Sequence, residues 1–348
     1  MDPLRIAIVG AGLMGQSHLS VLSRRSDARA CAFVDPAPAA QAMAQTAGLP
    51  LFQTLPALLS TQRPDGLIIA TPNALHVEQT LEAVAAGLPV LLEKPVATSV
   101  EEGQRLLEAV QAAGARVLVG HHRAHSPIMA RASEVVASGR IGRVVAVQGS
   151  AMFFKPDQYF IDGPWRGQIG GGPILINMIH EVHNLRMLCG EVTEVQALSS
   201  HAVRGLPVED TVVINLRFDG GALGSFVLSD TAASARSWEQ TSQENKAYAS
   251  YADEDCYVIA GTMGTLSVPT LRLKTYPALQ ERSWMLPFEQ SVVDVRREDP
   301  LVLQMNHFVD LIAGRVQPRV SVYDGLQNLR VSQAIAEAAR SGGVVKLG

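Results

Sequence analysis

The sequence is poor in cysteine and in aromatic residues, and it contains no long apolar run. Its three cysteines, Cys31, Cys189 and Cys256, are widely separated and form no Cys-x-x-Cys pair, which predicts free thiols in a reducing cytoplasm. No apolar stretch approaches the roughly 20 residues that a membrane helix needs. No basic segment precedes the first apolar run, so we expect no secretory signal.

Charge and histidine spacing exclude further classes of partner. A net charge of −4 over 348 residues favours neither nucleic acid nor an anionic membrane surface. The densest histidine cluster, His121, His122 and His125, lies at an expected strand end, where adjacent side chains point in opposite directions. We therefore expect no metal site. At this length the chain has room for two domains, each with its own core.

The first 120 residues alternate between short apolar runs and helical patterns, which predicts parallel βαβ units in a doubly wound sheet. Strands are expected at Arg5–Gly10, Ala30–Asp35, Gly66–Ala70, Val90–Leu92 and Val117–Gly120. Helices are expected between them at Gly12–Arg24, Ala37–Ala47, Leu75–Ala86 and Val100–Ala113. The pattern predicts an α/β nucleotide-binding domain over residues 1–122.

After residue 122 strands dominate, which predicts an α+β domain with a large, mostly antiparallel sheet over residues 123–348. Its strands are expected at Arg143–Ala151, Val192–Ser200, Asp210–Phe218, Gly224–Thr231, Tyr257–Ala260, Thr265–Val268 and Leu271–Thr275. Helices are expected at Ile128–Ser138, Pro173–Leu188, Pro300–Ile312 and Asp324–Arg340. We expect the last two to pack back near the first domain and the polar segment Ser237–Asp255 to form a long ordered loop.

A glycine motif, Gly10-x-Gly12-x-x-Gly15, follows the first expected strand and opens a helix, which is the context of a dinucleotide-binding turn. The first glycine makes the turn, the second lets the backbone approach a pyrophosphate, and the third packs the helix against the strand. The pyrophosphate then rests on the helix N-terminus, where Leu13 and Met14 lie. The plainer alternative is a tight turn that binds nothing.

Asp35 ends the second expected strand about 20 residues after the last glycine, where a carboxylate can bind the ribose 2′-hydroxyl. The segment after it, residues 36–40, has no arginine or lysine to hold a 2′-phosphate. The pattern therefore predicts NAD rather than NADP. The same carboxylate can also cap the next helix, and the two roles are compatible.

Thr71, Pro72, Asn73 and His76 follow the strand expected at Gly66–Ala70. Residues at the carboxyl end of a parallel strand face the ligand crevice, so we expect these four along the ribose and nicotinamide side of the cofactor. The alternative is a plain helix start, with proline in the first turn and asparagine near the cap.

Glu93-Lys94-Pro95 directly follows the strand Val90–Leu92, in a chain where lysine is rare. A buried lysine can exchange a proton near neutral pH, whereas arginine cannot. Beside a nicotinamide ring such a lysine predicts an oxidoreductase. Glu93 can orient Lys94 or pair with it, and we expect both residues among those that bind the cofactor. The alternative is a strand-end salt bridge.

A glycine-rich segment, residues 170–172, opens a helix whose Asn177, His180 and Asn184 are spaced three and four apart and share one face. The glycines would let substrate or nicotinamide approach the backbone. His180 is the natural proton acceptor, with an unperturbed pKa of about 6.5. A histidine on such a helix is, taken alone, more often packed or solvated, which is what we expect of His18.

Taken together, these motifs resemble the glucose–fructose oxidoreductase / inositol dehydrogenase / MocA (Gfo/Idh/MocA) family. The match is the motif at Gly10–Gly15, then Thr71–Asn73, then Glu93–Pro95, then the glycine-rich helix with His180, over essentially the full length. The resemblance implies a Rossmann domain joined to an open-faced sheet domain, with the active site between them. It also implies hydride transfer from a secondary alcohol to nicotinamide, with Lys94 and His180 handling the proton.

The sequence departs from this family at one position. Members usually have an aspartate four residues before the histidine, where this chain has Ile176, followed by Asn177. Asparagine can orient a substrate hydroxyl or the imidazole of His180 but carries no charge. We therefore expect Lys94 to carry more of the proton transfer, and inositol specificity does not carry over.

Aromatic and cationic residues suggest where a substrate binds. Candidate contacts, beside Lys94, Asn177 and His180, are Arg123, Tyr159 in the segment Phe153–Tyr159, Trp165 and Arg166. Aromatic faces suit a sugar ring or a cyclic diol, and an arginine can bind a carboxylate or a polyol. The alternative is that the phenylalanines of this segment belong to the core and Arg166 to the surface.

These observations predict an NAD-dependent dehydrogenase that oxidises a secondary hydroxyl of a sugar, cyclitol or related cyclic polyol, or reduces the matching ketone. The rivals are an NAD-dependent glycoside hydrolase of the same fold, a cis-dihydrodiol dehydrogenase and a non-catalytic NAD-binding regulator. An antiparallel sheet with one uncovered face tends to find a partner. We therefore expect a homodimer or homotetramer formed through the second domain's sheet.

Overall fold

The structure is a computed structural model that describes residues 2–348. The chain divides into two compact units, the first reaching to His125 and including Pro300–Leu329, the second formed by Ser126–Asp299 and Arg330–Gly348. The division thus falls after His125 rather than after residue 122. The helix expected at Pro300–Ile312 belongs to the first unit.

The first unit contains a six-stranded, wholly parallel sheet with the strand order β3-β2-β1-β4-β5-β6. Its strands are β1 (Leu4–Val9), β2 (Ala28–Val34), β3 (Leu51–Phe52), β4 (Gly66–Ile69), β5 (Val90–Leu92) and β6 (Val117–Val119). Its helices are α1 (Leu13–Leu22), α2 (Ala39–Ala47), α3 (Leu55–Thr61), η1 (Asn73–Leu75), α4 (His76–Ala85), α5 (Val100–Ala113), η2 (His122–His125) and α10 (Pro300–Ile312).

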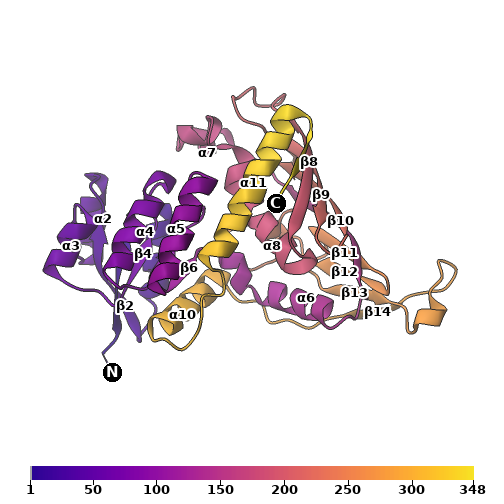
Figure 1. The fold of residues 1–348 in the computed structure, drawn as a ribbon, viewed down its shortest axis with the longest axis horizontal. Helices are drawn as coiled ribbons and strands as arrows, with labels where there is room; N and C mark the ends of the chain where they lie inside the picture. The colour runs from indigo at the N-terminus through magenta and orange to yellow at the C-terminus, as the bar shows by residue number, and fades with distance from the viewer. Residues whose placement is uncertain (1) are drawn as a thin grey trace. The chain divides into compact units, whose positions relative to one another are not determined.

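This unit confirms the predicted doubly wound fold. Strands β4 and β5 are apolar and buried throughout, and β1 is buried over its last four residues, as parallel strands between helix layers are. Helix α5 illustrates how sequence sets the ends: Ser99 accepts the N–H of Glu102 at the start, and Gly114 ends it with φ +56°. Helices α4 and α5 lie side by side over the sheet (Figure 1).

The second unit contains a nine-stranded sheet with the order β14-β13-β12-β11-β7-β10-β9-β8-β15. Its strands are β7 (Val144–Met152), β8 (Val192–Ser200), β9 (Thr211–Phe218), β10 (Leu223–Ser229), β11 (Tyr257–Gly261), β12 (Gly264–Val268), β13 (Arg272–Thr275), β14 (Glu289–Val292) and β15 (Val344–Lys346). Its helices are α6 (Pro127–Ala137), α7 (Asp157–Ile161), η3 (Pro164–Gly167), the π-helix η4 (Ile174–Met178), α8 (Ile179–Cys189), α9 (Trp238–Thr241) and η5 (Leu279–Glu281). Helix α11 (Val322–Ser341) begins in the first unit and ends in the second.

The prediction of a mostly antiparallel sheet is confirmed, with β7 and β10 as the parallel pair. Helices α6, α8 and the end of α11 cover one face of this sheet and enclose the core with it (Figure 1). On the other face Leu198, Val213 and Leu223 are exposed by 71, 44 and 50 %. The alternation buried-exposed along β9 reflects these two environments.

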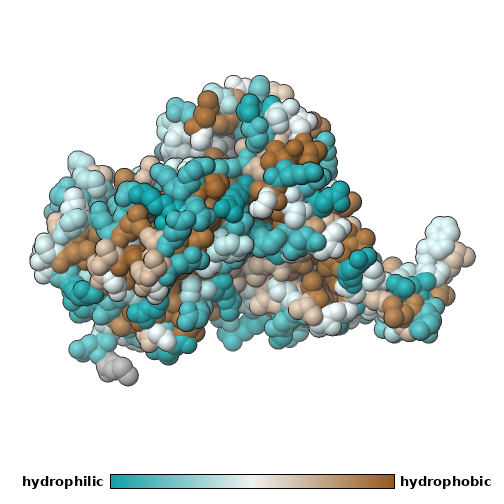
Figure 2. All heavy atoms as spheres, in the orientation of Figure 1, coloured by the Kyte–Doolittle hydropathy of each residue, from teal (hydrophilic) through white to brown (hydrophobic). Residues whose placement is uncertain are grey.

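Between β13 and β14 the chain projects away from the sheet, and the hydropathy view shows pale and brown atoms on it beside teal ones (Figures 1 and 2). Apolar side chains of this segment are exposed, most of all Trp284 at 95 % and Met285 at 79 %. No local sequence pattern predicts this projection.

Several short elements escaped prediction, namely β3, α3, α7, α9, β14 and β15. The three cysteines are free, as predicted. Within residues 2–348 no helix has both the length and the apolar character needed to span a bilayer.

Candidate active site

The three glycines of the motif have distinct steric surroundings. Gly10 has φ +97°, and a Cβ there would lie 2.5 Å from the carbonyl oxygen of Ala70. A Cβ on Gly15 would lie 2.0 Å from the carbonyl oxygen of Gly10. A Cβ on Gly12 would meet no protein atom within 4 Å. Gly10 and Gly15 are therefore needed by the fold, whereas Gly12 leaves open a space that a ligand can enter.

That space lies at the N-terminus of α1. Gly12 is the N-cap, no side chain caps the helix, and its first turn carries no acidic residue. Leu13 is 73 % exposed and Met14 is half-buried. The uncapped N–H groups and the helix dipole suit a pyrophosphate, so these residues fit a dinucleotide.

Asp35 follows β2 and holds the glycine loop. Its Oδ2 accepts the N–H of Ala11 at 2.8 Å, and its Oδ1 accepts the N–H of Ala37 at 2.8 Å. The carboxylate thus fixes both the glycine loop and the start of the segment before α2. Its contact with a ribose stays a prediction.

The four residues after β4 differ in exposure. Pro72 and Asn73 are exposed and Thr71 is half-buried, with its hydroxyl donating to Gln79 Oε1 at 2.7 Å. His76 is buried, and its two ring nitrogens lie 2.7 Å from the Pro95 carbonyl oxygen and 2.9 Å from that of Thr71. Burial lowers the pKa of His76 despite these two contacts. His76 therefore ties this loop to Pro95, and its contact with the cofactor stays a prediction.

Glu93 is a buried carboxylate that contacts α1. Its Oε1 lies 2.8 Å from Nε2 of His18, which is fully buried. Burial alone would raise the pKa of Glu93, but the hydrogen bond and the charge of His18 outweigh it, so the pKa lies below its ordinary value. His18, expected only to be a packed side chain, is thus the partner of the motif's glutamate.

Lys94 is half-buried at the carboxyl end of β5, and a cis peptide bond joins it to Pro95. Arg123, in η2, is only 2 % exposed. Both belong to the first unit, together with the glycine loop.

The helix expected at Pro173–Leu188 is present, but its first turn is π-helical. Such turns occur often at functional sites. His180 and Asn184 both lie in the α-helical part that follows, where Asn184 is fully buried and donates to Tyr257 Oη at 3.0 Å. Ile176 and Asn177 are half-buried in this turn, and His180 is 8 % exposed in α8.

Two of the three glycines before this helix are required because a Cβ would clash with neighbouring protein atoms. A Cβ on Gly171 would lie 2.6 Å from the carbonyl oxygen of Arg166, and one on Gly172 would lie 2.7 Å from Glu209 Oε1. Only at Gly170 would a Cβ meet no protein atom within 4 Å. The predicted approach of a ligand to this backbone is therefore limited to Gly170.

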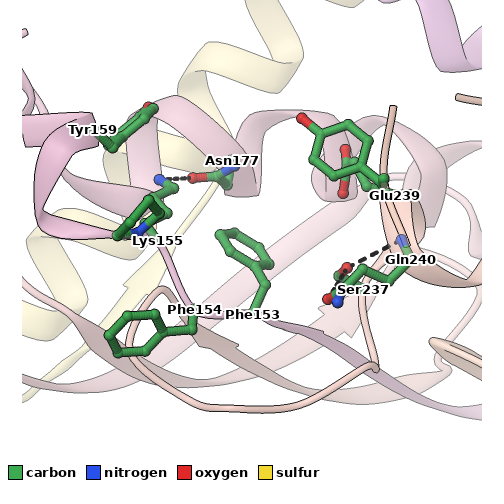
Figure 3. Close-up of a pocket in the computed structure, with 10 residues that line it drawn as sticks. Phe153, Phe154, Lys155, Tyr159, Asn177, Ser237, Glu239 and Gln240 are labelled. Carbon is green, nitrogen blue, oxygen red and sulfur yellow. Dashed lines mark hydrogen bonds between the residues drawn. The ribbon is translucent and has the colours of Figure 1, made fainter. Parts of the chain in front are cut away.

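A cavity of about 330 Å³ lies within the second unit (Figure 3). Four aromatic side chains line it, Phe153, Phe154, Tyr159 and Tyr248. Its polar lining residues are Lys155, Asn177, Ser237, Glu239 and Gln240. Phe154 is 58 % exposed and Phe153 half-buried, so the alternative in which both are core residues is wrong.

Lys155 is the cationic residue of this cavity. Its Nζ donates to Asn177 Oδ1 at 2.7 Å, lies 3.6 Å from Asp230 Oδ2, and sits 4.7 Å from the centre of the Tyr159 ring. Burial lowers the pKa of Lys155 to about 8, against the opposing charge of Asp230. Asn177, a predicted substrate contact, therefore does line a cavity.

The other predicted aromatic and cationic contacts form a neighbouring stack. The Arg166 guanidinium lies 4.0 Å from the Tyr159 ring centre and 5.8 Å from that of Trp165, and it donates to the Tyr159 carbonyl at 2.6 Å. Trp165 is 53 % exposed. Tyr159 lines the cavity, whereas Trp165 and Arg166 do not.

Sequence reasoning missed the far wall of the cavity. Ser237, Glu239, Gln240 and Tyr248 come from the segment that was predicted only as a long ordered loop. The one available signal was the presence of tyrosines in a polar segment. Within residues 2–348 no group of three or more histidine, cysteine, aspartate or glutamate side chains is arranged to hold a metal ion.

Comparison with known proteins agrees with this organisation. The model of the oxidoreductase family with an NAD-binding Rossmann fold (GFO_IDH_MocA) matches residues 4–121, and the model of the GFO/IDH/MocA C-terminal domain matches residues 129–267. A 1,5-anhydro-D-fructose reductase of Ensifer adhaerens is 28 % identical over 292 residues, which cover 80 % of this chain and 78 % of that protein. An inositol 2-dehydrogenase of Rubrobacter xylanophilus is 27 % identical over 362 residues, covering 99 % of this chain and 94 % of that protein.

Among solved structures, the WlbA dehydrogenase of Bordetella pertussis, in complex with NADH and UDP-GlcNAcA, has a TM-score of 0.79 at 26 % identity and covers 99 % of both chains. The two family models together span most of this chain, and the glycine loop fits the cofactor for which the first is named. The chain therefore belongs to the NAD-binding Gfo/Idh/MocA family of oxidoreductases.

Proposed function

We propose that the protein is an NAD-dependent dehydrogenase that oxidises a secondary hydroxyl of a sugar, cyclitol or related cyclic polyol, or reduces the matching ketone. The observation that carries this proposal is the position of Lys94 at the end of β5. Strands β1 and β5 are parallel members of one sheet, so Lys94 and the glycine loop lie at the same edge. Ligands of open α/β sheets bind at that edge.

In this proposal NAD, when bound, accepts the hydride from the alcohol carbon. Lys94 takes the hydroxyl proton, and His180 is a second proton acceptor. Asn177, in the π-helical turn directly before α8, hydrogen-bonds and orients the substrate. Glu93 keeps the Lys94 backbone in place through its buried bond to His18.

The relatives support an alcohol or ketone on a ring as the reacting group. One is named an anhydrofructose reductase, another an inositol 2-dehydrogenase, and a third was crystallised with NADH and the sugar nucleotide UDP-GlcNAcA. Their differing names do not select one substrate for this chain.

The test is to follow NADH absorbance while the purified protein is offered NAD and a panel of sugars, cyclitols, sugar acids and cis-dihydrodiols. Steady NADH formation with one class supports the dehydrogenase. Cleavage of a glycoside without net NADH formation would replace it by the hydrolase. NAD binding without either reaction would favour a regulator.

We also propose that the protein forms a homo-oligomer through the second unit's sheet. The exposed apolar side chains Leu198, Val213 and Leu223 lie on the face that the helices leave uncovered. Light scattering of the purified protein tests this: a dimer or tetramer is expected, and a clean monomer would refute it.

A further inference from the structure

The cavity of the second unit is polar at two separate places and aromatic between them. Lys155 and Asn177 lie on one side, Ser237, Glu239 and Gln240 on the other, and the Phe153 ring lies between the two groups (Figure 3). A ligand that fills this space therefore meets a cation at one end and hydrogen-bonding groups that include a carboxylate at the other.

At the cationic end Lys155 and Arg204 share the carboxylate of Asp230, and Arg204 also lies 3.5 Å from the exposed Asp157. Asp230, 1 % exposed, faces two cations, and the shorter ion pair is with Arg204, whose Nε lies 3.0 Å from Oδ1. Lys155 is 3.6 Å from the other oxygen. One buried carboxylate thus serves two cations, and Lys155 is the one held less closely.

Lys155 also retains hydrogen-bonding capacity. An ammonium has three N–H donors. Lys155 directs one at Asn177 Oδ1, 2.7 Å away, and a second faces Asp230 Oδ2 at 3.6 Å, which leaves one donor for a ligand. Burying a charge is costly unless it is paired and hydrogen-bonded. A ligand anion at this end would complete the set of hydrogen-bond partners of Lys155, which lines the cavity.

The remaining walls restrict which anion fits. Glu239 lines the same cavity, so a ligand with several negative charges would be repelled at the far end. Ser237 and Gln240 beside it can hydrogen-bond neutral hydroxyls. The rings of Phe153 and Tyr248 suit the apolar face of a sugar ring, whereas Lys155 and Arg166 already lie over the Tyr159 ring. The volume of about 330 Å³ lies at the small end of ligand sites.

We propose that this cavity binds a sugar acid, with the single carboxylate at Lys155 and Asn177 and the hydroxyls toward Ser237, Glu239 and Gln240. The inference rests on the proposed function, since it names the acidic members of the sugar class as the substrates. Lys155 acts in it as a specificity-determining residue and not as the proton acceptor.

The experiment is calorimetric titration of the NADH-loaded full-length protein, in which no oxidation of an alcohol can proceed. The probes are D-glucuronate and D-galacturonate, their neutral counterparts D-glucose and D-galactose, and the methyl ester of D-glucuronate. Wild type is compared with Lys155→Met, Lys155→Arg and, as a matched control, Lys274→Met, which alters an exposed lysine on β13.

A hydrogen bond to a charged group is worth about 1.5–3 kcal/mol, which corresponds to roughly 10- to 150-fold in affinity. Wild type should therefore bind an acid at least about tenfold more tightly than its neutral counterpart or its ester. Lys155→Met should abolish that preference, while Lys155→Arg keeps part of it and Lys274→Met all of it.

Equal affinity for acid, ester and neutral sugar, or no measurable binding of either acid, would overturn the inference. The ester comparison uses wild type alone, so it stands even if the Lys155 variants fold poorly. NADH formation from NAD with the same probes is measured separately. Acid binding through Lys155 without NADH formation would contradict the dehydrogenase proposal but support the cavity assignment. NADH formation from neutral sugars alone would support the dehydrogenase proposal but contradict the cavity assignment.

Discussion

Nε2 of His18 lies 2.8 Å from Oε1 of Glu93, so the buried glutamate beside Lys94 is held by a side chain of the helix that follows the glycine loop. The two residues are 75 positions apart in the chain. Through them, helix α1 after the glycine loop and the strand end that carries Lys94 are joined directly.

This bond should make stability depend on pH through Glu93. The pKa of Glu93 is lower in the fold than its ordinary value, so its stabilising contribution is present above the unfolded pKa of about 4.3 and is lost as the pH falls through the folded pKa. Glu93→Gln should be less stable than wild type at neutral pH, by roughly 1–3 kcal/mol. The difference should shrink as the pH falls below about 4.3.

Thermal unfolding at stepped pH measures this difference. Glu78→Gln is the control, because Glu78 forms an exposed ion pair with Arg105 and should change stability little. If Glu93→Gln were less stable than wild type by the same amount at every pH, the ionisation of Glu93 would not be what stabilises the fold.

Two glycines of the same motif should respond oppositely to alanine. Gly12→Ala places a Cβ in space that no protein atom occupies, whereas Gly15→Ala drives one into the Gly10 carbonyl. Gly12→Ala should keep the wild-type melting temperature without NAD but bind NAD at least about tenfold more weakly, a loss of about 1.4 kcal/mol. Gly15→Ala should melt at a lower temperature. NAD affinity unchanged in Gly12→Ala would place the pyrophosphate elsewhere.

Asp35 should decide between NAD and NADP. Wild type should have the higher kcat/KM with NAD, since a carboxylate repels a 2′-phosphate and residues 36–40 offer no cation. Asp35→Ser combined with Pro36→Arg should reverse the preference by supplying a 2′-phosphate partner. Steady-state kinetics with both cofactors measures this, and a wild-type preference for NADP would remove the assigned role of Asp35.

Sugar-acid affinity should weaken as the pH rises through about 8, where Lys155 loses its proton in the ligand-free protein. Burial lowers this pKa, with Arg204 and Arg166 adding to the effect and Asp230 opposing it. Titrations between pH 6 and pH 9 (roughly two units below and one above the transition) should show the loss in wild type. Lys155→Arg should not show it, because arginine stays charged, and an equal loss there would implicate another group.

The sequence predicts the first unit well because its signals are local. Strands β4 and β5 are continuous apolar runs, and the spacing of Gly10, Gly12 and Gly15 indicates what each glycine does. The helix limits at Val100–Ala113 coincide with those predicted, since Ser99 and Gly114 mark both ends. Short elements such as β3 and α9 were missed because few residues carry their pattern.

Only some of the residues that line the second unit's cavity could be predicted from the sequence. Asn177 and Tyr159 were predicted, but the π-helical turn that sets the position of Asn177 has no spacing signature of its own. Glu239 and Tyr248 reach the cavity because the segment after β10 folds back to it, a long-range arrangement. The partnership of His18 with Glu93 likewise joins residues that no local pattern relates.

In the proposed reaction Lys94 takes the hydroxyl proton as the alcohol is oxidised. The most direct measurement is the single-turnover rate of NADH formation by wild type and Lys94→Ala at saturating NAD, with the alcohol that the panel identifies. General acid–base help is typically worth about 10²–10⁴-fold, so the variant should be slower by that order while binding NAD as wild type does. A variant that forms NADH at a near-normal rate would contradict the account and remove the lysine from the mechanism.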